Sequence, residues 1–340
     1  MATNHRTVFV LAIAIAASLS LRPHAFHQAN PYVGAWTITP AGATMGPVYW
    51  LEVKDQNGRL SGMFLNGGGH ALPTESVKVE NGELIFVYNA GSAAAPRLTE
   101  YRARLEGGTL MVHTIIAPGR RGGDPAQPPA PPAPRAVNWV GVRPPVWPAS
   151  NANGTHTYGA PVVLFDGKSL DAFGGQHPTA PLNWSVVDGV MTNPTKPADN
   201  LVSKQKFQNF KVACEFKVAE HTNSGIYLRG RYELQVLNDI HDTTTEPFLA
   251  QMAIYGRVPP AVKASKGVDE WQTMEAILVG NRVTVTLNGK RVHDNVAIIG
   301  VTGGALDGDE LSPGPLMIQG DHEQVWFRKV VVTPIVTAGK

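Results

Sequence analysis

The sequence is poor in cysteine, in charge and in helical periodicity, and each shortage excludes a class of protein. Cys214 is the single cysteine among 340 residues, so no disulfide can form within the chain. A catalytic thiol would need a nearby histidine and a basic setting, which the flanking residues do not provide. Charged residues make up only 16% of the chain, and the net charge is +2. Without a block of like charges, the sequence predicts no nucleic-acid partner and no anionic membrane surface.

The residues that are present favour strands and turns. The chain is 43% hydrophobic and contains 35 Gly and 27 Pro. Short alternating segments separated by turn residues recur along it, and almost no segment keeps helical spacing beyond a turn or two. These patterns predict an all-β fold, and the length suggests two domains.

The N-terminus has the features of a secretory signal peptide. His5 and Arg6 precede an apolar run from Val8 to Leu21. A run of about 14 residues is too short to span a bilayer comfortably but suits a signal sequence. We expect residues 1–29 to be a signal peptide, the mature protein to have no membrane part, and its location to be periplasmic or secreted.

Turn signals and composition divide the rest of the chain into two modules. Residues 30–145 are expected to form a small antiparallel β domain, a barrel or a sandwich, with a Pro-rich loop that includes 127–134. Residues 146–161 are interpreted as a linker, and 162–337 as a larger domain of two antiparallel sheets packed face to face. The strand candidates of this larger domain are 184–187, 190–192, 210–218, 225–229, 232–237, 251–255, 271–279, 282–287, 314–319 and 325–334.

The most informative alternation lies within residues 223–236. Apolar residues occupy even positions from Ile226 to Val236, and the polar residues between them are Arg229, Arg231, Glu233 and Gln235. Because successive side chains of a strand point to opposite faces, one face enters a core and the other presents two guanidinium groups, a carboxylate and an amide. We expect the catalytic residues to lie on this polar face. The alternative is an ordinary cross-strand salt bridge on a solvated face.

Ordered motifs along the second module resemble the 3-keto-disaccharide hydrolase domain family. The motifs are LFDGKSL (164–170), WSVVDGV (184–190), FKVACEF (210–216), NSGIYLR (223–229), YELQV (232–236), AIYG (253–256), EWQT (270–273), LNG (287–289), GPLMIQ (314–319) and VWFR (325–328). The resemblance implies a concanavalin-like jelly-roll β-sandwich, export to the periplasm and action on oxidised glycosides. The family commonly has Gly after the His of its final loop, where this chain has Glu323 after His322.

A single carboxylate in this strand favours elimination over direct hydrolysis. Direct glycoside hydrolysis usually needs two suitably spaced carboxyl groups, and residues 232–236 contribute one. A ketone at sugar C3 acidifies the C2 proton, so one base can remove it, the C1 substituent leaves, and water adds to the enone. We predict an enzyme that cleaves 3-keto-glycosides in this way, with no cofactor and no metal. The predicted catalytic residues are Glu233 as base, Arg229 as enolate stabiliser and His322 as acid, and the predicted carbohydrate-binding residues are Asn223, Arg231, Gln235, Tyr255, Trp271 and Gln319.

Two other functions stay open from the sequence. Lectins share this sandwich, so a carbohydrate-binding module without catalysis is one alternative. A conventional endoglucanase is the other, with Asp239 or Glu215 as the second carboxylate. The oxygen-rich segments 238–242 and 307–310 could bind a cation, and we interpret both as solvated turns.

Overall fold

The computed structural model describes residues 30–43, 46–116, 135–194, 198–241 and 245–339. The predicted signal peptide and residues 127–134 lie outside these ranges. The described residues form strands and loops with one short 3-10 helix, η1 (Pro247–Leu249), which confirms the all-β prediction. No helix in the described part of the chain is long and apolar enough to cross a membrane.

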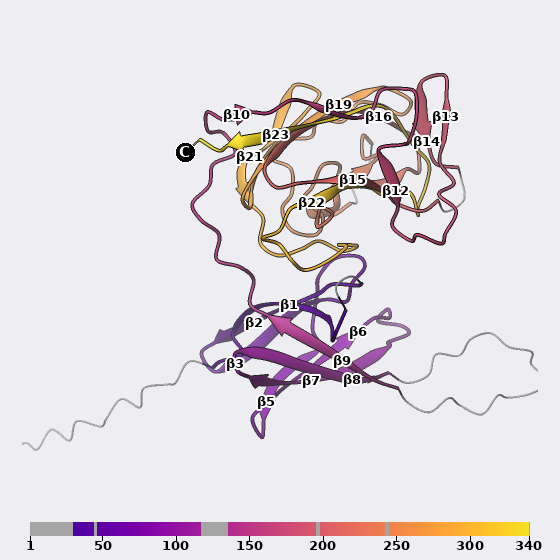
Figure 1. Ribbon diagram of the computed structural model, residues 1–340. Helices are drawn as coiled ribbons and strands as arrows, with labels where there is room; N and C mark the ends of the chain where they lie inside the picture. Colours follow the sequence, from indigo (N-terminus) through magenta and orange to yellow (C-terminus); the bar gives the residue numbers. More distant parts are fainter. Residues whose placement is uncertain (1–29, 44–45, 117–134, 195–197, 242–244, 340) are drawn as a thin grey trace, which may run out of the picture. The chain divides into compact units, whose positions relative to one another are not determined.

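The first nine strands form one curled antiparallel sheet, drawn in indigo to magenta in Figure 1. Its strands are β1 (Gly34–Pro40), β2 (Tyr49–Gln56), β3 (Arg59–Leu65), β4 (Leu72–Pro73), β5 (Ser76–Glu80), β6 (Glu83–Asn89), β7 (Leu98–Glu106), β8 (Thr109–Ile116) and β9 (Arg135–Val142). They run in the order β4-β3-β2-β1-β9-β8-β7-β6-β5. The amide of Thr74 donates to the carbonyl of Gly62 at 2.9 Å next to the β3–β4 pairing, and β3 also contacts β5, so the two ends of the sheet meet. Phe86 and Tyr101 stack inside the curl with ring centroids 4.8 Å apart.

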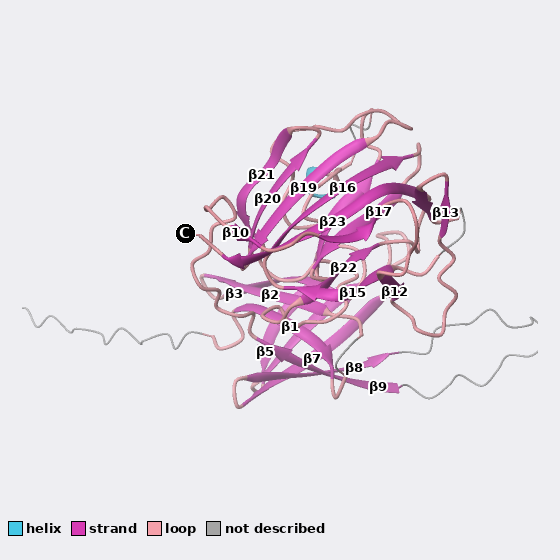
Figure 2. Cartoon of the chain, turned by 45° about the horizontal axis from the view of Figure 1, so that its top comes forward, coloured by secondary structure: helices cyan, strands magenta, loops and turns pink. Residues whose placement is uncertain are grey.

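The remaining strands form two sheets of a β-sandwich. The larger sheet contains β10 (Thr157–Tyr158), β11 (Val162–Phe165), β13 (Ser185–Val187), β14 (Val190–Thr192), β16 (Phe210–Val218), β19 (Gln272–Val279), β20 (Arg282–Leu287), β21 (Lys290–Ala297) and β23 (Val325–Thr337). The smaller sheet contains β12 (Phe173–Gly175), β15 (Leu201–Phe207), β17 (Asn223–Leu228), β18 (Tyr232–Leu237) and β22 (Gly314–Ile318). Figure 2 shows the strands of the larger sheet side by side.

The two sandwich sheets share one hydrophobic core. Side chains of β16 alternate between buried and half-buried, and Val212 and Phe216 meet Leu234 and Ile318 of the smaller sheet in this core. In contrast, β18 and β22 are buried along nearly their whole length. Both faces of the smaller sheet are therefore covered, and its polar side chains are shielded from water as well as its apolar ones.

The edge of the smaller sheet corrects one strand prediction. Residues 251–255 form no strand; they pair with the outer edge of β18 through one isolated bridge, between Ile254 and Leu234. The amide of Gln235 donates to the carbonyl of Ala253, and the amide of Met252 donates to the carbonyl of Gln235. This loop satisfies the backbone groups of an edge strand that would otherwise be open. Within the sandwich, strands β10, β11, β12, β15 and β21 were not predicted.

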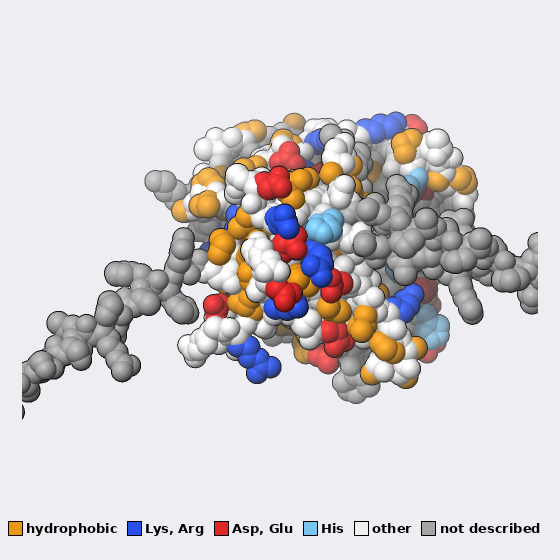
Figure 3. All heavy atoms as spheres, turned by 90° about the horizontal axis from the view of Figure 1, so that it is seen from below, with side chains coloured by type: hydrophobic (Ala, Val, Ile, Leu, Met, Phe, Trp, Pro, Cys, Tyr) orange, Lys and Arg blue, Asp and Glu red, His pale blue; other side chains and the backbone are white. Residues whose placement is uncertain are grey.

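The outer face of the curled sheet carries charges of both signs. Figure 3 shows acidic and basic side chains interspersed on the face of the molecule seen from below. Some ion pairs join neighbouring strands, such as that of Arg104 with Glu83 at 2.7 Å. Others lie within one strand or just beside it, such as that of Lys78 with Glu80. Exposed pairs of this kind contribute little to stability because water screens them.

Candidate active site

The hairpin β17–β18 places Glu233 over a glycine. In its antiparallel register Tyr227 lies opposite Glu233, and Gly225 lies opposite Gln235. A β-carbon at Gly225 would be 2.4 Å from Oε1 of Glu233. The missing side chain at Gly225 thus leaves the space that the Glu233 carboxyl group occupies.

The carboxyl group of Glu233 is buried and accepts hydrogen bonds from two side chains. The hydroxyl of Tyr227 donates to its Oε2 at 2.8 Å. The side-chain amide of Gln235 matches the hydrogen-bonding groups around it when its nitrogen faces Oε1 of Glu233, 3.0 Å away. The residue is only 3% exposed, and burial raises its pKa from 4.5 to about 8, although the hydrogen bond from Tyr227 opposes this rise. Near neutral pH such a group is suited to proton transfer.

His322 and Asp321 form a second titratable pair next to Glu233. They follow β22, and Nδ1 of His322 lies 2.9 Å from Oδ1 of Asp321. This hydrogen bond raises the pKa of His322, and the charge of Glu233 adds to the rise. In turn, the charge of His322 lowers the pKa of Glu233. The structure therefore brings Glu233 and His322 into one electrostatic environment, as a base and an acid would require.

Two aromatic residues and a histidine lie beside this group. The backbone amide of Tyr255 donates to the carbonyl of Glu233 at 3.0 Å. Burial raises the pKa of the Tyr255 hydroxyl, and the charge of Glu233 adds to this rise. His70, from the loop between β3 and β4, lies with its ring 6.3 Å from that of Tyr255 and 5.5 Å from that of Phe248. Burial lowers the pKa of His70, so its imidazole is neutral near pH 7. Sequence reasoning had found no chemistry in the first module, and His70 carries no motif that could have marked it.

The model of the 3-keto-alpha-glucoside-1,2-lyase-like domain matches residues 160–333, just over half of the 340 residues. The chain belongs to this family. The match confirms the resemblance seen in the ordered motifs, and it covers β11 to β23 with the hairpin that holds Glu233. Membership assigns the sandwich to the carbohydrate-processing enzymes.

Several crystal structures are similar to the family domain. A candidate glycosyl hydrolase of Parabacteroides distasonis is 29% identical, over 56% of this chain and 92% of that one, with a TM-score of 0.45. A second from the same organism is 24% identical, over 52% of this chain and 100% of that one, with a TM-score of 0.42. The carbohydrate-binding module CBM66 of Bacillus subtilis is 13% identical, over 50% and 96%, with a TM-score of 0.29. No curated protein matches the chain.

Arg229 and Arg231 do not lie beside Glu233, contrary to the prediction from alternation. Arg229 donates to the carbonyl groups of Gly280 and Glu310, and Arg231 binds Asp307 at 2.6 Å and the carbonyl of Ser312 at 2.8 Å. Both are buried. The reason is the turn between the strands, where Arg229 has a φ of 54° and Gly230 a φ of 66°. Strand alternation ends at Leu228, so these two side chains leave the face that carries Glu233.

The other predicted binding residues divide between the two sheets. Asn223 lies on β17, and its Oδ1 is 3.3 Å from the side-chain amide of Gln235. Gln319 follows β22, and its backbone amide donates to the carbonyl of Gly225 at 2.9 Å. Trp271, by contrast, precedes β19 of the larger sheet and lies under Arg328, 4.4 Å from its ring centroid. Trp271 therefore does not provide a stacking platform beside Glu233.

The suspected second carboxylates and cation ligands have other partners. Glu215 pairs with Arg328 on the larger sheet, and Asp239 accepts hydrogen bonds from Ser265 at 2.6 Å and from the amide of Gln251 at 3.2 Å. The carboxylate whose charge reaches Glu233 is Asp321. Within the described residues no three His, Cys, Asp or Glu side chains group as metal ligands, and Asp242 lies outside those residues.

The raised pKa of Glu233 predicts that the protein loses stability as pH rises. Between about pH 4.5 and pH 8 the folded state keeps a proton on Glu233 that the unfolded state has released, so unfolding becomes easier through this window. Glu233→Gln removes this dependence. We expect the variant to be more stable than the wild type at pH 9 by about 2–4 kcal/mol, with the difference vanishing near pH 4. Denaturant unfolding at both pH values measures this, and a difference that does not depend on pH would contradict it.

Proposed function

We propose that the family domain of this chain cleaves 3-keto-glycosides by elimination and hydration. The observation that carries the proposal is a buried Glu233 with a pKa raised to about 8, next to the His322–Asp321 pair. The family to which the domain belongs, the 3-keto-alpha-glucoside-1,2-lyase-like domains, supports elimination across C1 and C2. A perturbed carboxyl group of this kind favours an enzyme over a lectin-like module, which has no use for a base.

Each step has a residue that can perform it. Glu233 takes the C2 proton, and the electron pair of that bond forms an enolate with the C3 ketone. The enolate then re-forms the ketone as the C1–oxygen bond breaks, which gives a C1–C2 double bond, and His322 protonates the departing oxygen. Water adds to C1 and a proton returns to C2, so the products are the alcohol and the free 3-keto sugar.

The enolate needs a donor other than the predicted Arg229. The hydroxyl of Tyr227 donates to Glu233, and the hydroxyl of Tyr255 is close enough for the charge of Glu233 to act on it. Burial is the main cause that raises the pKa of both hydroxyl groups, so both remain protonated. Because the one hydroxyl proton of Tyr227 is donated to Glu233, we assign the stabilisation of the enolate oxygen to Tyr255, and the binding of sugar hydroxyl groups to Asn223, Gln235 and Gln319.

Deuterium at C2 of the substrate tests the elimination step. Removal of the C2 proton by Glu233 breaks that bond, so a substrate with deuterium at C2 should react with a clear primary isotope effect on kcat/KM. Direct displacement at C1 leaves the C2 bond intact and would give only a small secondary effect. An isotope effect near unity, with chemistry limiting the rate, would contradict the proposal.

The pH dependence of kcat/KM follows from the same pKa. A base must be ionised, so activity should increase with pH up to about pH 8, with a limb that reports Glu233 in the free enzyme. Because His322 must be protonated, activity should fall again above its own raised pKa. Rates measured from pH 5 to pH 10 test this. A decrease through pH 8 that remains in His322→Gln would identify Glu233 as an acid instead.

A conventional glycosidase is the second candidate function, because Asp321 provides a second carboxyl group. Its charge raises the pKa of Glu233, so two carboxyl groups share this site, as direct hydrolysis requires. In that mechanism unoxidised glucosides would be cleaved, and Asp321→Asn would abolish their cleavage. In the elimination mechanism Asp321 acts by holding His322.

We also propose that the chain is exported. The basis is the apolar run from Val8 to Leu21 behind two basic residues. Cell fractionation and N-terminal sequencing of the extracytoplasmic protein test this, and an intact N-terminus in the cytoplasm would contradict it.

A further inference from the structure

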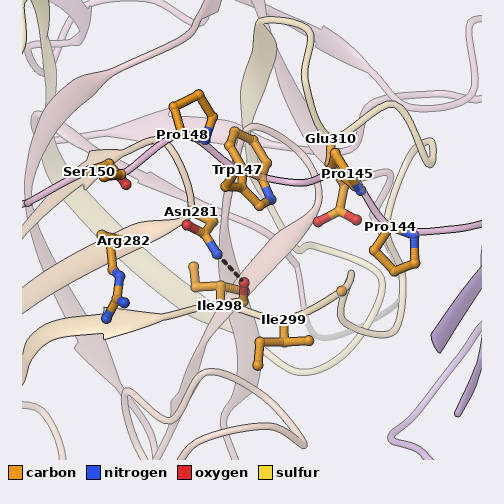
Figure 4. Close-up of a pocket in the computed structure, with 12 residues that line it drawn as sticks. Pro144, Pro145, Trp147, Pro148, Ser150, Asn281, Arg282, Ile298, Ile299 and Glu310 are labelled. Atoms are coloured by element: carbon orange, nitrogen blue, oxygen red, sulfur yellow. Dashed lines mark hydrogen bonds between the residues drawn. The ribbon is translucent and has the colours of Figure 1, made fainter. Parts of the chain in front are cut away.

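A pocket of about 420 Å³ lies near the turn of the β17–β18 hairpin, where Arg229 and Tyr232 contact its lining residues Trp147 and Glu310. Residues that precede β10 form one wall, and the turn after β19 and the loops after β21 form the others. Its size is within the range of small-molecule sites. The residues that carry the argument are Trp147, Ser150, Asn281, Arg282, Ile299 and Glu310, labelled in Figure 4.

Glu310 supplies a buried carboxyl group that is only half satisfied. The residue is 2% exposed, and its Oε2 accepts a hydrogen bond from the hydroxyl of Tyr232 at 2.8 Å. Its Oε1 is buried and has no hydrogen-bond partner. Figure 4 shows this carboxyl group pointing toward the space between Trp147 and Ile299. A buried acceptor without a partner costs free energy, so a donor brought by a ligand would be favourable here.

The other walls supply one aromatic face and several polar groups. Trp147 lies on the guanidinium of Arg229, 5.1 Å from its ring centroid, and this contact fixes the ring over the sandwich. The hydroxyl of Ser150 is also buried without a partner. The amide nitrogen of Asn281 donates to the carbonyl of Ile298 at 3.1 Å, which orients its amide group at the pocket. Arg282 adds a guanidinium group, which donates to the carbonyl of Asn295 at 3.1 Å.

We propose that this pocket is a second carbohydrate-binding site for a neutral saccharide. The guanidinium charges of Arg229, Arg231 and Arg257 act on Glu310, so the pocket carries no lone negative charge that would select a cation. Buried acceptors and donors around a fixed aromatic ring match the hydroxyl groups and the apolar face of a pyranose. The site does not depend on the chemistry proposed at Glu233, since its lining residues differ from those that contact Glu233. It would hold the glucoside chain or its product while Glu233 acts on an oxidised sugar.

Calorimetric titration of the mature protein with methyl glucoside and glucose tests the proposal. The titration uses the Glu233→Gln background, so that turnover adds no heat. We expect saturable binding in the millimolar range, and about tenfold weaker binding or more in Trp147→Ala and in Glu310→Gln. Trp326→Ala is the matched control, because it removes a tryptophan that stacks on Lys217 in the larger sheet, 4.8 Å from its ring centroid.

Two results would overturn the proposal. One is the absence of saturable binding for both sugars, and the other is equal affinity in the wild-type pocket and in Trp147→Ala. Thermal unfolding identifies a variant that fails to fold. If Glu310→Gln does so, Trp147→Ala decides, since that residue lies in a half-buried segment outside both sheets. Failure of catalysis at Glu233 leaves this test unaffected.

Discussion

Glu233→Gln should lower kcat for a 3-keto-glucoside by about 10²–10⁴-fold, the range that a positioned general base contributes. Glutamine keeps the size of the side chain and can still accept the hydrogen bond that Tyr227 gives to Oε2. Glutamine cannot accept the proton that the base removes from C2 of the sugar. The loss should therefore appear in kcat with little change in KM, and steady-state kinetics with a purified 3-keto-glucoside measures both.

Glu215→Gln is the control for this substitution. Glu215 was a suspected second carboxylate, and the structure places it in an ion pair with Arg328 on the larger sheet. Its replacement should leave kcat within a factor of about two. Full activity in Glu233→Gln, with normal folding, would remove Glu233 from the chemistry.

Gly225→Ala should also abolish most activity, although Gly225 bears no functional group. The added carbon would lie 2.4 Å from Oε1, 2.8 Å from Cγ and 2.9 Å from Cδ of Glu233, so the carboxyl group has to move. A displacement of about 1 Å at a catalytic group can cost about 10²-fold in rate. We expect a loss of that size in kcat, and a fall in the pKa of the ascending limb as Glu233 moves toward water.

Gly174→Ala is the matched control for the glycine. Gly174 lies on β12 of the same sheet, and a β-carbon there would meet no atom within 4 Å. This variant should keep wild-type kcat and stability. If both alanine variants keep full activity, Glu233 does not need the position seen over Gly225.

Alternation along the strands predicted most of the sandwich because a core imposes it. In β16 every second side chain is buried, and the predicted bounds 210–218 agree with the strand. Strand β15 was missed since its centre, Ser203 to Lys206, is polar and lacks alternation. Residues 251–255 read as a strand since they are apolar, but they are buried as a loop against the edge of β18.

The same reasoning predicted the arrangement of part of the candidate site. It placed Glu233 and Gln235 on one face correctly because both lie inside β18. It failed for Arg229 and Arg231 because the positive φ angles at Arg229 and Gly230 end the strand there. A hairpin centred on Gly230 pairs Tyr227 with Glu233, so the sequence could also have predicted this neighbour of Glu233. The proximity of His322 to Glu233 depends on how β22 pairs with β17, which no local pattern encodes.

Product release from a matched pair of substrates tests the central claim most directly. The purified mature protein is incubated with a 3-keto-glucoside and with the same glucoside unoxidised, and the released alcohol is followed by chromatography. We expect release from the keto substrate alone, because only a C3 ketone makes the C2 proton acidic enough for Glu233 to remove. Release from the unoxidised glucoside at a comparable rate would contradict elimination and establish direct hydrolysis with Asp321.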